Sequence, residues 1–176
     1  MGSPETSKQG MEEDVNLKSN MRKVALTALA GTSIEWYDFF LFGVAAALIF
    51  PKAFFSEATP IMALISSFLV FGIGFVARPL GGVIFGHFGD RIGRKKTLIM
   101  ALMLMGVSST LIGLLPTYAM IGVAAPILLA LLRFAQGLAI GGQWGGAMLL
   151  VTESAPDHKR GYYGAYAQAG APVGVI

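Results

Sequence analysis

Two carboxylates lie inside the first long apolar run of this 176-residue chain. Glu35 and Asp38 are three residues apart in the run 24–50, so a helix places them on one face. Each ionised carboxylate costs about 2.5–3.5 kcal/mol near the centre of a bilayer, so we expect both to face a bundle interior or a water-filled cavity. Burial and mutual repulsion make the protonation of such a pair respond to its surroundings. The pair predicts proton coupling or substrate binding, and a static ion pair with a neighbouring helix is the alternative.

A second polar group centres on an arginine in the run 121–151. Arg133 stays charged, so it requires an acidic partner or an anionic substrate. Gln136 follows near the same face, and Trp144 returns to nearly the same direction because three helical turns take about 10.8 residues. Gln143 is adjacent to Trp144. We expect this group to line one wall of a cavity. The alternatives are a structural pair between Arg133 and one of the two carboxylates, and a packing or anchoring role for Trp144.

A second arginine lies within the run 61–85. Arg78 is followed by Pro79, and its long stem lets the guanidinium reach polar groups toward the end of the run. A structural role and a contact with substrate are both consistent with this position.

The sequence contains no motif that is typical of a metal site or a catalytic nucleophile. The sequence has no cysteine, so it offers no thiolate site, and it contains neither an HExxH metal motif nor a GxSxG nucleophile motif. We therefore expect no metal, no cofactor and no catalytic residue. An intramembrane enzyme built on the two carboxylates is a remote alternative, because no nucleophile accompanies them.

The composition is typical of a membrane protein. Hydrophobic residues make up 55% of the chain and charged residues 13%, against about 25% charged residues in a soluble domain. The net charge is +3, but the basic residues stand beside apolar runs, which is the positive-inside pattern. We therefore expect the lipid bilayer, and not nucleic acid, as the partner of these charges.

The apolar runs predict an all-α membrane protein. A helix of about 20 residues crosses a hydrocarbon core of about 30 Å. Four runs approach or meet this length, and a fifth is cut off by the end of the chain, so we expect four full transmembrane helices and a truncated fifth. The polar residues 1–23 are expected to form a disordered tail. The expected transmembrane domain is 24–176, with spans near 24–50, 61–85, 97–115, 121–151 and 162–176.

Lysine and arginine residues alternate between the connections. They gather just before the first run and in the second and fourth connections, whereas the first connection has one and the third has none. This alternation predicts a multi-pass protein of the cell (inner) membrane with a cytoplasmic amino terminus.

Glycines recur at intervals of four in two of the runs. Small residues at this interval let helix backbones approach closely in lipid. We expect this packing role for Gly82, Gly86, Gly137, Gly141 and Gly145.

The charged stretch between the second and third runs carries a recognisable spacing. It reads GHFGDRIGRKK over Gly86–Lys96 and resembles the G-x-x-x-D-R-x-G-R-[RK] signature of the major facilitator superfamily. RFAQG at Arg133–Gly137 resembles the fourth-helix motif of that superfamily, in which the arginine is buried. The residues that match the first signature are Gly86, Asp90, Arg91, Gly93, Arg94 and Lys95.

A third stretch, ESAPDHKRG from Glu153 to Gly161, resembles the E-x-x-P-x-x-x-R-G cassette that follows the fourth helix in the sugar-porter and metabolite-porter branches. The resemblance implies a cytoplasmic gate in which Asp90 meets a helix end or basic partner and Arg91 or Arg94 reaches Glu153. Arg160 is the arginine of this cassette.

Two further stretches point to one branch. IEWYDFFLFG at Ile34–Gly43 and GGQWGGA at Gly141–Ala147 resemble the metabolite:proton symporter family, which carries organic acids, shikimate, proline and betaine in bacteria. Many members have glutamate where this chain has Gln143. This difference shifts the expected proton role to Glu35 and Asp38.

The resemblance implies a function and a partial fold. Members have twelve helices in two six-helix halves, so the chain is expected to be an amino-terminal fragment whose carboxy-terminal half is missing. We expect proton-coupled symport of a small organic acid, betaine or similar zwitterionic metabolite. The alternative is a truncated, transport-incompetent membrane protein that is inert or acts only by binding other membrane proteins.

Overall fold

The computed structural model describes residues 4–155 and 160–175, with side chains described for 26–93, 95–143, 155, 160–162, 164–165, 168 to 174. These residues form helices and no strand. The helices are α1 (Pro4–Leu48), α2 (Phe50–Phe54), α3 (Pro60–Ile92), α4 (Arg94–Gly113), α5 (Tyr118–Ile121), α6 (Ala124–Ser154) and α7 (Arg160–Val175).

Three helices in the described part of the chain are long and apolar enough to cross a membrane. They are Pro60–Ile92, Lys95–Gly113 and Ala124–Gln143, and they correspond to the second, third and fourth expected spans. α1 and α7 occupy the places of the first and fifth expected spans. The all-α membrane class is therefore supported, whereas four full spans plus a truncated fifth stays a prediction.

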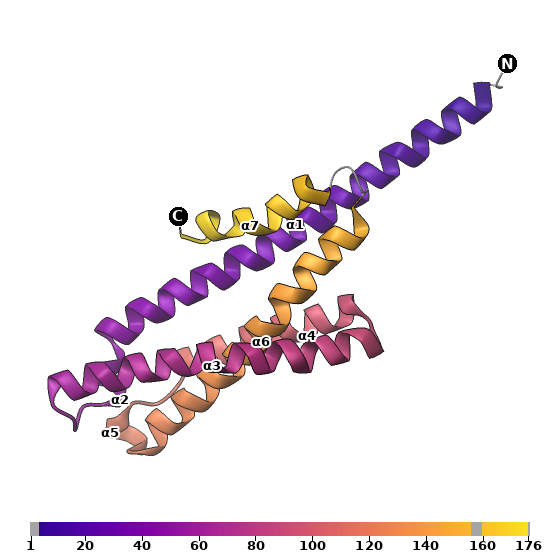
Figure 1. Ribbon diagram of the computed structural model, residues 1–176. Helices are drawn as coiled ribbons and strands as arrows, with labels where there is room; N and C mark the ends of the chain where they lie inside the picture. The colour runs from indigo at the N-terminus through magenta and orange to yellow at the C-terminus, as the bar shows by residue number, and fades with distance from the viewer. Residues whose placement is uncertain (1–3, 156–159, 176) are drawn as a thin grey trace.

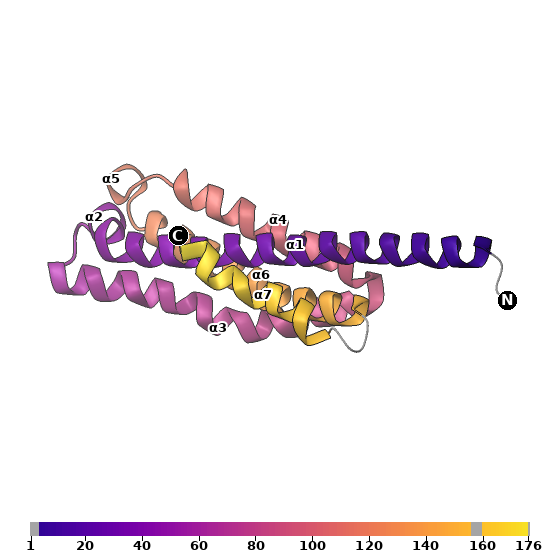
Figure 2. The same cartoon turned by 90° about the horizontal axis from the view of Figure 1, so that it is seen from above.

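α1 begins earlier than the sequence led us to expect. The helix starts at Pro4, within the stretch 1–23 that we expected to be a disordered tail, and Figures 1 and 2 show its first half extending past the other helices. This stretch is polar but contains three glutamates and three lysines, which have high helix propensity, and no proline after Pro4.

The helices pack as two groups. α6 packs most extensively against α3 and also against α4, while α7 packs along α1. Contacts between α1 and either α3 or α6 are fewer than those between α1 and α7. Figure 1 shows α7 following α1 on one side of the molecule, with α3, α4 and α6 crossing on the other. We call these groups the α1–α7 pair and the α3–α4–α6 group.

The connection between α3 and α4 is a single residue. α3 continues to Ile92 and α4 begins at Arg94, so the charged stretch that we interpreted as a loop is almost entirely helical. Gly93 has φ of 98°, a backbone conformation that other residues rarely adopt, and its N–H donates to the carbonyl of Gly89. The charged residues beyond the apolar run are compatible with a helix, so α3 continues through them and ends only at Gly93.

Glycines allow α3 and α6 to touch backbone to backbone. A Cβ atom on Gly141 would collide with the carbonyl group of Arg78, and one on Gly81 would collide with the carbonyl group of Leu138. Gly137 similarly faces Gly74. The packing role predicted for Gly137 and Gly141 is therefore confirmed.

Two glycines of the predicted set behave differently. A Cβ on Gly82 would make only an ordinary contact, 3.7 Å from the carbonyl oxygen of Gly141, and one on Gly86 would meet nothing within 4 Å. On α3 the close contact with α6 is made by Gly74 and Gly81 instead. The spacing of the glycines along α3 does not by itself tell which side of that helix faces α6. Gly145 lies outside the residues whose side chains are described.

Gly141→Ala tests this close contact. We expect the substitution to lower the free energy of unfolding by about 1–3 kcal/mol, because the added methyl group meets a backbone carbonyl that cannot move aside. Thermal unfolding in detergent micelles, followed by circular dichroism, measures the loss. Gly106→Ala on α4 is the matched control: its Cβ would meet nothing within 4 Å, so stability should stay equal or rise. Equal losses in both variants would contradict the assignment.

Candidate functional site

Asp38 joins three helices through hydrogen bonds. The Ser109 hydroxyl of α4 donates to Asp38 Oδ1 at 2.7 Å, and Gln136 Nε2 of α6 donates to Asp38 Oδ2 at 2.8 Å. Gln136 Nε2 also donates to Ser109 Oγ, at a distance of 2.6 Å between the nitrogen and the oxygen. The carboxylate on α1 therefore accepts bonds from both neighbouring helices, which hold it in position.

Ser109 was not predicted from the sequence, and its hydroxyl differs from others in these helices. Thr32, Ser67 and Thr110 each donate to the carbonyl four residues earlier in their own helix. Ser109 instead donates to another helix. The only signal in the sequence is a pair of serines in the middle of an apolar run, which marks a polar spot but not its partner.

Arg133 is enclosed in the bundle, with 1% of its surface exposed. Its Nη1 donates to Gln136 Oε1 at 2.8 Å. Its guanidinium carbon lies 3.9 Å from the ring centre of Phe42 and 5.1 Å from that of Phe71, both within cation–π range. A Cβ on Gly74 would lie 2.7 Å from Arg133 Nε, so the absent side chain there leaves room for the guanidinium.

Gln136 therefore stands between a cation and an anion. Its carbonyl oxygen faces Arg133 and its amide nitrogen faces Asp38, so each end of the amide dipole meets the charge that it suits. Arg133 also interacts electrostatically with Asp38. We call Arg133, Gln136, Asp38 and Ser109 the polar relay. The expected pairing of Arg133 with a carboxylate is thus made through an intervening amide.

Glu35 lies near the other arginine. The Glu35 side chain is 4% exposed and interacts electrostatically with Arg78 of α3. Arg78 is less enclosed than Arg133, and its guanidinium carbon lies 4.7 Å from the ring centre of Phe75 and 5.5 Å from that of Phe39. Both carboxylates face the inside of the bundle, but they act on different arginines.

Gln143 packs apart from the polar relay. It is 1% exposed, and a Cβ on Gly31 of α1 would lie 3.3 Å from its Nε2. Among the residues described, its Oε1 accepts no hydrogen bond. The side chain of Trp144 lies outside the described residues. The common wall expected for Arg133 and Trp144 therefore stays a prediction.

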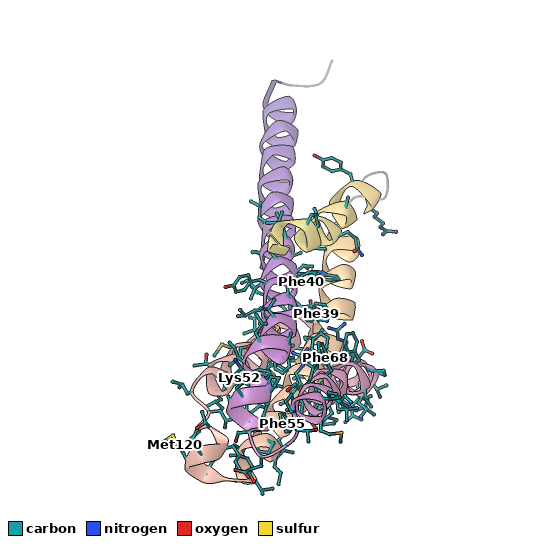
Figure 3. All side chains as sticks on the ribbon, turned by 90° about the vertical axis from the view of Figure 1, so that its left-hand side faces the viewer. Phe39, Phe40, Lys52, Phe55, Phe68 and Met120 are labelled. Atoms are coloured by element: carbon teal, nitrogen blue, oxygen red, sulfur yellow. The ribbon has the colours of Figure 1, made fainter. Side chains whose placement is uncertain are left out.

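A cavity of about 410 Å³ opens beside the polar relay. Asp38, Ser109 and Gln136 of the relay line it, together with Phe50 and Phe54 of α2. The cavity therefore extends from the relay toward the α2–α5 end of the bundle. This end faces the viewer in Figure 3, where Lys52, Phe55 and Met120 mark it.

The signature residues gather at the opposite end of α3. Asp90, Arg91 and Lys95 are exposed around the Gly93 turn, and Arg160 is exposed at the start of α7. The side chains of Arg94 and Glu153 lie outside the described residues, so the expected contact between them stays a prediction.

Gln136→Leu tests the polar relay. The substitution keeps the volume but removes one hydrogen bond from Arg133 and one from Asp38, so we expect a loss of about 1.5–3 kcal/mol for each charged bond. Unfolding in mixed detergent micelles with added dodecyl sulfate measures it. Gln168→Leu, the same change at an exposed position of α7, should alter stability by less than about 0.5 kcal/mol. A small loss at Gln136 would mean that the relay contributes little.

Known proteins resemble this chain over nearly its whole length. It is 52% identical over 163 residues to the inner membrane metabolite transport protein YhjE of Escherichia coli, and this match covers 93% of the chain and 37% of that protein. It is 51% identical over 158 residues to the shikimate transporter of Escherichia coli, covering 90% of the chain and 36% of the relative. It is 41% identical over 156 residues to the proline/betaine transporter of Salmonella typhimurium, covering 89% of the chain and 31% of the relative.

The chain thus spans about a third of the length of these relatives, all of which are transporters and not enzymes. No solved structure matches it significantly. Residues 23–176 match the family described as sugar (and other) transporter. The chain therefore belongs to the sugar (and other) transporter family of the major facilitator superfamily.

Proposed function

We propose that this chain provides the first helices of a proton-coupled symporter for a small organic acid or zwitterionic metabolite in the bacterial inner membrane. The amino terminus is cytoplasmic in this proposal, and the remaining helices of the transporter complete the substrate path. The relatives named above carry shikimate, or proline and betaine, or are described as metabolite transporters, which supports this class of substrate.

One observation carries the proton part of the proposal: Asp38 borders a cavity and also connects three helices. Its carboxylate is reachable from the cavity and is bonded to α4 and α6 through Ser109 and Gln136. A group that exchanges protons must have both properties, access for the proton and contacts that change when the charge changes.

Protonation of Asp38 alters the polar relay in a definite way. The neutral carboxyl group gives up one acceptor site and attracts Gln136 Nε2 less strongly, since the bond is no longer assisted by charge. Gln136 remains bonded to Arg133, which cannot lose its proton under these conditions. The link that weakens is therefore the one between α1 and the α3–α4–α6 group, and helix movement in alternating access is proposed to begin there.

Arg78 is the proposed contact for the carboxylate of an organic acid. Arg133 is enclosed by Phe42, Phe71 and Gln136, so it holds charge within the bundle without meeting substrate. Arg78 is only half-buried, and Glu35 acts on it electrostatically. A substrate carboxylate can compete with Glu35 for this arginine. Asp90, Arg91 and Lys95 are proposed to contact the other half of the transporter at the cytoplasmic face.

Asp38→Asn tests the proton role. Asparagine resembles the protonated carboxyl group in shape and charge, so we expect exchange of substrate across the membrane to persist while accumulation driven by a pH gradient falls to background. The assay uses protein produced from the entire open reading frame in proteoliposomes, with labelled shikimate, proline and betaine. Glu57→Gln, which neutralises an exposed acid outside the cavity, should keep full accumulation.

Two results would contradict the proposal at different points. Full pH-driven accumulation by Asp38→Asn would rule out Asp38 as the proton carrier. Absence of uptake by the unsubstituted protein for every compound would reject transport of this class and favour a membrane protein that acts only through binding partners.

A further inference from the structure

Ser109 is bonded on both sides within the polar relay. Its hydroxyl donates to Asp38 Oδ1 at 2.7 Å, and its oxygen accepts from Gln136 Nε2 at 2.6 Å. Gln136 Nε2 also donates to Asp38 Oδ2 at 2.8 Å. A hydroxyl group can both donate and accept, whereas an amide nitrogen only donates. The two hydrogen-bond partners of Asp38 therefore differ in what they can do when the carboxylate gains a proton.

Of these two partners, only Ser109 can accept a hydrogen bond from the protonated carboxyl group. A hydrogen on Asp38 Oδ1 that points at Ser109 Oγ stays bonded inside the relay. A hydrogen on Oδ2 that points at Gln136 Nε2 would face another donor. The relay therefore favours a proton on the carboxylate oxygen beside Ser109.

Ser109 has a second acceptor for its own hydrogen. The carbonyl group of Met105 lies four residues earlier in α4. The hydroxyls of Ser67 and Thr110 donate to the carbonyl in this same relation, at 2.9 Å and 2.8 Å. A change of the serine rotamer exchanges one acceptor for the other. The hydroxyl can thus donate across to Asp38 of α1 or back to its own helix.

The charges near Asp38 come from α1, α3 and α6. Arg133 of α6 interacts electrostatically with it, Glu35 lies one turn earlier on α1, and Arg78 of α3 interacts with Glu35. The other described residues that line the cavity carry no ionisable side chain. α7, which packs along α1, has no acidic or basic residue between positions 161 and 175. Ser109 can therefore reverse its bond to Asp38 without a change in its own charge.

We propose that Ser109 is a positioning residue for proton coupling, whose hydroxyl donates to ionised Asp38 and accepts from protonated Asp38. The proposal rests on the proposed transport function and adds the residue through which protonation on α1 reaches α4. The bond to the ionised carboxylate is assisted by charge, and the reversed bond is not. The link between α1 and α4 is therefore weakened by the proton and kept, while Ser109 turns toward Met105.

Ser109→Ala removes the hydroxyl and tests this role. We expect accumulation driven by a pH gradient to fall at least about tenfold, the effect of losing one hydrogen bond to a charged group, while exchange of substrate continues. Ser109→Thr keeps a hydroxyl and should keep accumulation. Thr110→Val is the matched control, since the Thr110 hydroxyl donates to Gly106 in its own helix and does not line the cavity. It should accumulate substrate fully. Protein from the entire open reading frame is assayed in proteoliposomes with labelled shikimate, proline and betaine.

Infrared spectroscopy of the same proteins measures the bond between Asp38 and Ser109 without transport. The carbonyl band of the protonated Asp38 carboxyl group is identified by its absence in Asp38→Asn. It should move to higher wavenumber in Ser109→Ala, because a hydrogen bond is lost, and stay in place in Ser109→Thr. Ser109→Cys keeps a similar shape with only a weak donor and acceptor, so it should show the same shift and the same loss of accumulation if Ser109→Ala does not fold.

The outcomes separate this inference from the transport proposal. Full pH-driven accumulation by Ser109→Ala would overturn the role of Ser109, as would a carbonyl band that does not move. Loss of accumulation in Ser109→Thr would also overturn it, because shape and not the hydroxyl would then matter. Loss of accumulation in Asp38→Asn alone would leave the proton role of Asp38 intact. If the unsubstituted protein takes up no compound, transport is rejected, and the infrared shift alone decides whether Ser109 accepts from protonated Asp38.

Discussion

Arg133 imposes the main constraint on this bundle, because its charge cannot be removed and almost none of its surface is exposed. The surrounding residues each answer that constraint. Gly74 leaves space, Phe42 and Phe71 present their rings, and the oxygen of Gln136 accepts a hydrogen bond. Once that oxygen is committed to Arg133, the amide nitrogen must point the other way, toward Asp38.

The backbone contact between α3 and α6 is a condition for this arrangement. The same helix face that carries Arg133 also carries Gly137 and Gly141, which let α6 approach α3 closely. In lipid, apolar side chains gain little by leaving their surroundings, so close packing and interhelical hydrogen bonds have to hold helices together. The glycine contacts and the polar relay therefore both hold the helices together, and α6 contributes residues to both.

The approximate positions of α3, α4 and α6 could be predicted, because the length of an apolar run can be read directly from the sequence. The free-energy cost of a charge in the membrane can be assigned to a single residue in the same way. The interior positions of Glu35 and Asp38 follow from that cost alone. The partners of these side chains do not follow, since Ser109 on α4 meets Asp38 only after three helices pack. Charge patterning placed the α3–α4 connection correctly but made it too long, because charged residues mark where a helix leaves lipid, while the backbone angle of Gly93 decides where it ends.

The division of helices into two packed groups has a mechanical consequence. The α1–α7 pair meets the α3–α4–α6 group through relatively few contacts, and the bonds of Asp38 cross that boundary. Apolar side chains also meet across it, since Phe42 of α1 packs in one cluster with Val70 of α3 and Leu129 of α6. In the proposed mechanism, a proton on Asp38 weakens the hydrogen bonds that cross this boundary, so a small chemical change is linked to the relative movement of whole helices.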